Sequence, residues 1–144
     1  MNFLIKKILA FFDFSNKKKI IRNLKRINPN GSFKVVLDVG AHEGESIELF
    51  LKNFDVEHIY SFEPSEFTFK TLTKNCENLR KKFTNTKIHL ENIAIGYWTK
   101  DVELNFLRES SSSTLKDLNI NFKYFKKKEK YLGKLLNKKI KVKQ

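Results

Sequence analysis

A glycine-containing segment and a later acidic residue have the types and spacing needed to bind a nucleoside. The segment runs from Asp38 to Gly44 with the sequence DVGAHEG, and Glu63 lies 19 positions beyond its last glycine. Gly40 lets the backbone turn sharply beside a ligand, and Gly44 lets a helix begin close to a sheet. An acid at Glu63, at the tip of a second strand, accepts hydrogen bonds from both hydroxyls of a ribose. The pattern favours a nucleoside cofactor over its alternative, a glycine turn with only a structural role.

The residue at the middle of this turn, His42, indicates which nucleoside cofactor the turn can bind. Dinucleotide-binding turns have the pattern G-x-G-x-x-G, whose second glycine admits the pyrophosphate. A histidine there obstructs the pyrophosphate, and the turn has no Lys or Arg to compensate. S-adenosylmethionine carries an ammonium and a sulfonium group and no phosphate, and Asp38 is well placed to receive the ammonium directly or through water. We therefore expect S-adenosylmethionine, with His42 contacting the cofactor and not acting as a base.

Hydrophobic patterning predicts the elements that position these residues. Residues 35–39 form an apolar run with one acid near its end, which predicts a strand covered on both faces. A helix should follow Gly44, because apolar residues recur on one helical face at Ile47, Phe50, Leu51 and Phe54. A second strand is predicted over residues 58–63. It stops at Pro64, after which Ser65 is expected to cap a helix that runs to about residue 78.

The sequence beyond residue 86 predicts further strands. A third strand is expected over residues 87–95, followed by a turn and a partner strand over 101–106 that pairs with it as a hairpin. A lysine-rich segment after residue 116 predicts one more helix, and residues 140–142 begin another strand. The predicted fold class is therefore α/β, a Rossmann-like parallel sheet that is incomplete, with a β-hairpin.

The two ends of the chain are strongly basic. Residues 1–34 carry a net charge of +8, residues 35–115 carry −4 and residues 116–144 carry +9. Residues 1–32 predict a basic amphipathic helical extension, with Ser15 as an internal cap and a break at residues 28–31, and residues 33–144 form the partial cofactor-binding domain. The extension is expected to pack on its own domain or a partner, with an anionic membrane surface as the alternative. Only four of the 29 basic residues are arginines, so the charge is interpreted as compositional and no nucleic-acid partner is expected.

Cysteine content and hydropathy indicate in which cellular compartment the protein is expected. Cys76 is the only cysteine, which excludes an intramolecular disulfide and fits a reducing compartment. It is predicted to be a buried apolar residue on a helix. The apolar run at residues 8–12 is much shorter than the ~20 residues that a spanning helix needs. We expect a cytoplasmic protein without a transmembrane segment or a metal site.

Four segments in order resemble the landmarks of the FkbM family of methyltransferases: DVGAHEGES at 38–46, SFEPS at 61–65, NIAIG at 92–96 and the serine run at 110–113. The resemblance covers about residues 33–115. It implies a class I methyltransferase fold and O-methyl transfer from S-adenosylmethionine to a hydroxyl of a small metabolite or a glycan sugar. It also implies that the cofactor is contacted by Asp38, Gly40, Ala41, His42, Gly44, Glu63, Pro64, Asn92 and Ala94. The last two would lie near the adenine.

The sequence departs from this family after the serine run. Members continue with a Leu-Asp pair and a Lys-Ile-Asp-x-Glu-Gly segment on the substrate side, and neither is present here. We therefore expect a truncated methyltransferase whose missing half is absent or supplied by a partner chain, and we assign no catalytic base. The alternatives are a fragment of an NAD-binding oxidoreductase and a non-enzymatic basic module that binds nucleic acid or a membrane surface.

Overall fold

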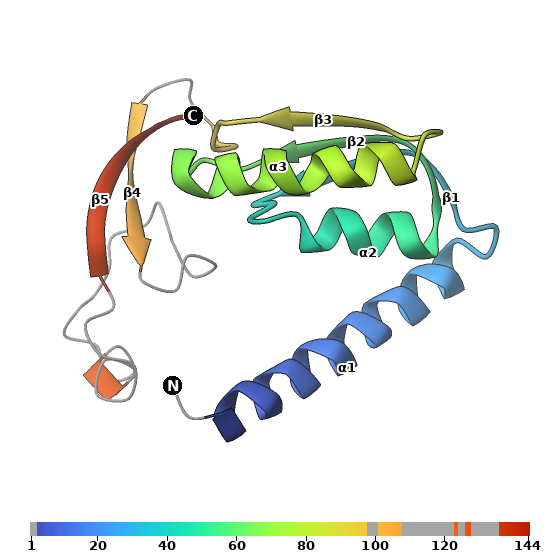
Figure 1. The fold of residues 1–144 in the computed structure, drawn as a ribbon, viewed down its shortest axis with the longest axis horizontal. Helices are drawn as coiled ribbons and strands as arrows, with labels where there is room; N and C mark the ends of the chain where they lie inside the picture. The colour runs from blue at the N-terminus through green and yellow to red at the C-terminus, as the bar shows by residue number, and fades with distance from the viewer. Residues whose placement is uncertain (1–2, 98–100, 108–122, 124–125, 128–135) are drawn as a thin grey trace.

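A computed structural model describes residues 3–97, 101–107, 123, 126–127 and 136–144 (Figure 1). Its main sheet has three parallel strands in the order β1-β2-β3, namely β1 (Ser32–Val39), β2 (Asp55–Phe62) and β3 (Lys87–Glu91). Val39 pairs with Phe62 and Phe62 pairs with Glu91, so the three strands end together at one edge. The helices α2 (Glu45–Asn53) and α3 (Glu66–Lys82) connect them. The predicted β-α-β-α-β order and the α/β class are confirmed.

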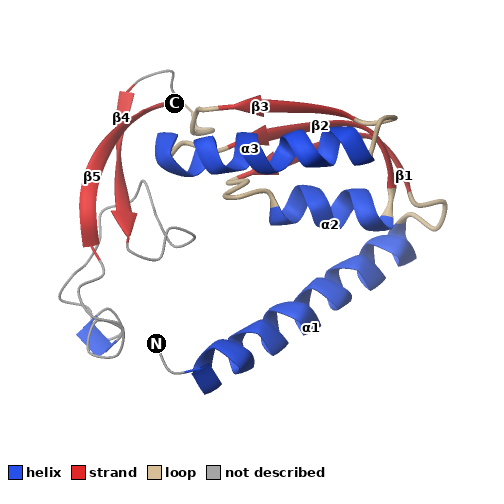
Figure 2. Cartoon of the chain, viewed as in Figure 1, coloured by secondary structure: helices blue, strands red, loops and turns tan. Residues whose placement is uncertain are grey.

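Both connecting helices lie on the same face of this sheet (Figure 2). Two successive crossovers of the same hand, stepping in the same direction across a sheet, must place their helices on one side. Residues from α2, α3 and the sheet form one buried cluster that includes Ile47, Leu51, Ile59, Leu72, Cys76 and Ile88. Ile59, Leu72 and Cys76 are completely buried, which confirms the prediction for the cysteine.

Side chains on the other face of β1 remain open to solvent. Val35, Leu37 and Val39 alternate along the strand and expose 52%, 67% and 63% of their surface. Sequence patterning predicts a strand covered on both faces, whereas in the described part of the chain only the face toward α2 and α3 is covered. The apolar residues on the open face suit a buried environment, which the described elements do not provide.

The basic extension is a single helix, α1 (Phe3–Ile27), with Ser15 inside it. The predicted internal cap at Ser15 is therefore wrong, because the helix continues through this residue. A serine inside a helix reduces helix stability by no more than about 0.7 kcal/mol relative to alanine. Ile21 and Leu24 pack against the main cluster. The predicted break is confirmed, because the helix ends before Asn28, whose N–H donates to the Leu24 carbonyl. None of the described helices combines the length and apolar character needed to cross a membrane.

The hairpin prediction is correct in type and wrong in its partner. β3 ends at Glu91, not at residue 95, and β4 (Asp101–Leu107) pairs antiparallel with β5 (Leu136–Lys143) in a separate sheet. Alternation along a strand shows that it has two different faces, but it does not specify which strand pairs with it. Leu104 and Val142 of this pair form a second, small cluster with Ala94. The serine run, Trp98 and most of the helix predicted after residue 116 lie outside the described residues.

Candidate functional site

The glycine turn joins the end of β1 to the start of α2 and is fixed against β2. The N–H groups of Gly40 and Ala41 both donate to the Phe62 carbonyl, at 2.9 and 3.0 Å. Gly40 and Gly44 have φ values of 81° and 99°, in the left-handed region that glycine adopts without steric cost. Gly44 occupies the N-cap position of α2. A Cβ at Gly40 would meet no atom within 4 Å, so the turn borders open space where a ligand could approach the backbone.

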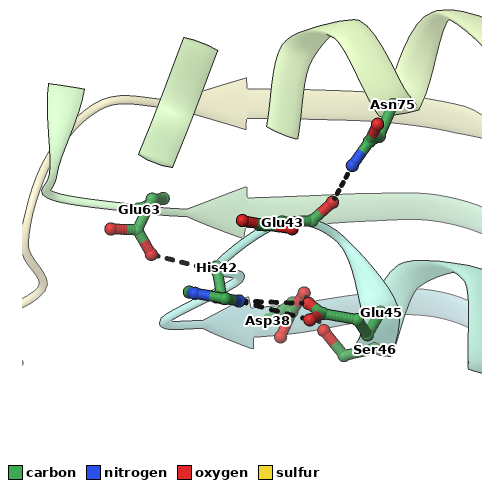
Figure 3. Close-up of polar contacts among 7 residues, drawn as sticks. All are labelled: Asp38, His42, Glu43, Glu45, Ser46, Glu63 and Asn75. Carbon is green, nitrogen blue, oxygen red and sulfur yellow. Dashed lines mark hydrogen bonds and ion pairs between the residues drawn. The ribbon is translucent and has the colours of Figure 1, made fainter. Parts of the chain in front are cut away.

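Glu63 follows β2 and is held by two backbone donors. Its Oε2 accepts from the His42 N–H at 3.0 Å (Figure 3), and its Oε1 accepts from the Ser65 N–H at 2.9 Å. A carboxylate oxygen has two lone pairs, so each oxygen keeps one for a further donor. Burial raises the pKa of the Glu63 carboxyl above its ordinary value, and the two backbone hydrogen bonds partly oppose the rise. The geometry leaves a fixed carboxylate with capacity for two hydroxyl donors.

Asp38 lies near the end of β1 and is fixed from the following helix. The hydroxyl of Ser46, in the first turn of α2, donates to Asp38 Oδ2 at 2.7 Å. Burial raises the pKa of the Asp38 carboxyl, and the Ser46 hydrogen bond lowers it in part. Ser46 belongs to the quoted motif, but its role was not predicted. Its position near the start of the helix after the turn was the available signal.

The site is rich in negative charge. Figure 3 shows Asp38, Glu43, Glu45 and Glu63 around His42, whose Nδ1 lies 3.2 Å from Glu45 Oε1. The carboxylates act on one another: the charge of Glu45 raises the pKa of Asp38, and the charge of Asp38 raises the pKa of Glu63. Such an environment favours a ligand that carries positive charge and disfavours a pyrophosphate. The acceptor oxygens of the site therefore suit a ligand that carries positive charge and hydroxyl donors.

The remaining predicted site residues differ in their contacts and in how far they are buried. Asn92 follows β3, and its Nδ2 donates to the Glu63 carbonyl at 2.7 Å, so its amide anchors the backbone of the site. Pro64 is half-buried between Glu63 and Ser65, whereas the side chain of Ala41 is buried in the core. Ala94 belongs to the second cluster, and its N–H donates to the Lys143 carbonyl at 2.7 Å.

The structure thus brings five predicted residues together at the carboxyl ends of β1 and β2, namely Asp38, Gly40, His42, Gly44 and Glu63. Ser65 has two roles in the structure, whereas the sequence predicted only helix capping. Its side chain caps α3 as predicted, and its backbone N–H also holds Glu63. Away from this site, His58 of β2 and His89 of β3 contact each other through Nδ1 and Nε2 at 3.3 Å.

The fold and the site define an α/β domain of the Rossmann-like type with a group of carboxylates at its first glycine turn. Neither a protein-family model nor a curated protein sequence matches this chain. Among solved structures, the methyltransferase FkbM from Methylobacillus flagellatus KT is similar, with 24% identical residues and a TM-score of 0.44. The similarity covers 50% of this chain and 20% of that protein, so this chain matches only a minor part of its length.

Proposed function

We propose that this chain binds S-adenosylmethionine at the carboxyl ends of β1 and β2 and is the cofactor-binding part of a methyltransferase. The observation that carries the proposal is the fixed Glu63 carboxylate, whose two oxygens each retain a lone pair for a ribose hydroxyl. Asp38, held by Ser46, receives the ammonium group, and the open space beside Gly40 accommodates the chain that links the two. The surrounding carboxylates favour the positive charges of this cofactor over the phosphates of NAD.

The transfer step follows from the chemistry of the cofactor and the sequence resemblance. When bound, S-adenosylmethionine would supply an electrophilic methyl group that an acceptor oxygen attacks in line, with S-adenosylhomocysteine as the leaving group. The residues of this chain bind and orient the cofactor, which reduces the entropic cost of alignment. The landmarks shared with the FkbM family support a hydroxyl acceptor on a small metabolite or a glycan sugar. No base is assigned among the described residues, so the acceptor's proton has no proposed recipient in this chain.

Calorimetric titration with S-adenosylhomocysteine tests the binding proposal. Glu63→Gln keeps the size of the side chain but turns one acceptor into an amide donor that faces a backbone N–H. We expect affinity to fall by roughly 10- to 100-fold, the effect of losing a charge-assisted hydrogen bond of about 1.5–3 kcal/mol. Glu57→Gln, on an exposed β2 residue, is the matched control and should leave affinity unchanged. Equal affinity in the two variants, or tighter binding of NAD than of S-adenosylhomocysteine, would contradict the proposal.

A further polypeptide that completes the sheet beside β1 is part of this proposal. The Gly40 N–H bonds to β2, and backbone groups alternate along a strand, so those of Val35, Leu37 and Val39 point away from β2. The same three residues expose apolar side chains. A strand pairing at this edge, with helices over the open face, would satisfy both features. Such a segment would also supply the acceptor side of the site.

A further inference from the structure

We infer that the second half of α1 is a docking surface for an anionic phospholipid membrane. Residues 15–27 contain six cationic side chains and no acid: Lys17, Lys18, Lys19, Arg22, Lys25 and Arg26. All except the half-buried Lys17 are exposed. This concentration of positive charge complements the negative potential of a membrane rich in anionic lipid.

The helix is held so that several of its cations face solvent. Ile21 and Leu24 anchor α1 on the main core cluster. On a helical projection, Arg22, Arg26 and Lys19 lie on the side opposite these two anchors, and all three are exposed. These cations can therefore meet headgroup phosphates while the packing of the helix on its domain is kept.

Exposed apolar residues next to two of these cations favour a membrane over a nucleic acid. Ile20 and Ile27 expose 48% and 77% of their surface, and they lie seven residues apart on the side of the helix that neighbours Lys19 and Arg26. Isoleucine gains nothing from contact with a phosphate backbone, but it gains from burial at the headgroup boundary of a bilayer. The first half of the same helix, residues 3–14, is mostly apolar in sequence and contains four phenylalanines. Polybasic and apolar residues together are the combination that stable membrane association requires.

This surface is separate from the proposed cofactor site. α1 leads into the amino end of β1 (Figure 1), whereas the glycine turn follows the carboxyl end of β1 and Glu63 follows that of β2. The inference therefore does not depend on the proposed function. Variants of the helix surface should keep the circular dichroism spectrum and the urea denaturation midpoint of the parent chain, which provides a check that they are folded.

Co-sedimentation of the full chain with vesicles tests the inference. We expect binding to vesicles of phosphatidylcholine with 30% phosphatidylserine, taken as about the charge of an anionic leaflet, and none to phosphatidylcholine alone. The triple variant Lys19→Glu, Arg22→Glu, Arg26→Glu should lower the affinity by roughly 100-fold or more, since each basic residue near the surface contributes about five-fold. Raising the salt concentration should weaken binding of the parent chain.

Two further variants separate the outcomes. Lys74→Glu, Lys81→Glu, Lys87→Glu makes the same change in net charge on exposed residues of α3 and β3 and should reduce binding much less. Ile20→Asn, Ile27→Asn should weaken vesicle binding and leave any binding to duplex DNA unchanged. The inference fails if the two triple variants lose equal affinity, if uncharged vesicles bind equally well, or if DNA binds and anionic vesicles do not.

Discussion

The backbone N–H of His42 donates to the Glu63 carboxylate over 3.0 Å, although the two residues lie 21 positions apart. The bond joins the glycine turn after β1 to the end of β2, so the turn and the acid that we propose to bind the ribose are held as one unit. His42 adopts a φ of 50°, in the left-handed region that is unfavourable for most side chains. The bond to Glu63 helps to hold it there.

Ligand binding should weaken as the pH falls. Burial raises the pKa of both Asp38 and Glu63, so these carboxyls take up protons at a higher pH than exposed acids do. A protonated Asp38 no longer attracts an ammonium group. We expect the affinity for S-adenosylhomocysteine to decline as the pH falls, starting at a higher pH than the usual titration range of carboxyls near pH 4. Calorimetry at a series of falling pH values measures the effect, and a flat profile for the parent chain would contradict it.

The same raised pKa values predict the sign of a stability change. A carboxyl that binds its proton more tightly when folded stabilises the fold at low pH, and this contribution is lost as the pH rises through the folded pKa. Asp38→Asn cannot ionise, so its stability relative to the parent should improve as the pH rises from about 3.5 to 7. Urea denaturation at both pH values gives the comparison. Asp55→Asn, on an exposed residue, is the control and should show no such trend.

Gly44→Ala should be more destabilising than Gly31→Ala. Both glycines have positive φ, at 99° and 66°, and a left-handed backbone costs an L-residue about 1–2 kcal/mol. At Gly44 the added Cβ would also lie 3.1 Å from Leu72 Cδ1, whereas at Gly31 the nearest atom is 3.8 Å away. The free energy of unfolding of each variant, from urea denaturation, tests this order. Equal losses would show that crowding against Leu72 is relieved at no cost.

The Cys76 thiol should be unreactive in the folded protein. It is completely buried beside Leu72, and burial raises its pKa, so the reactive thiolate is scarce. We expect a disulfide reagent such as DTNB to modify it only as fast as the chain opens, and rapidly in denaturing urea. Fast stoichiometric labelling under native conditions would show that the core between α2 and α3 opens readily.

The two faces of the main sheet should respond differently to polar substitution. Leu37→Thr lies on the open face and should change the free energy of unfolding by no more than about 0.5 kcal/mol while reducing self-association in sedimentation velocity. Ile59→Thr lies on the covered face and should cost more than about 2 kcal/mol, because it buries a hydroxyl and leaves a cavity. A large loss of stability from Leu37→Thr would indicate that the open face is covered in solution.

Local patterns in the sequence determined the order of the main elements. The apolar run before Asp38, the glycine turn, the stop at Pro64 and the cap at Ser65 each depend on residues close together in the chain, and each is found where it was predicted. Spacing also identified Asp38, Gly40 and Glu63 as neighbours, because parallel strands end at a common edge. These features follow from short-range sterics and hydrogen bonding.

Tertiary structure decided what depends on partners that are distant in the sequence. Glu63 is held by His42 and Ser65, Asn92 anchors the Glu63 carbonyl, and β4 pairs with β5 instead of β3. The alternation of apolar and polar residues along a strand does not specify which strand pairs with it. The sequence also does not show whether a polar side chain contacts a ligand or a backbone group. The sequence therefore determined the types and order of the residues at this site, whereas packing of the strands and helices fixed which atoms remain available to a ligand.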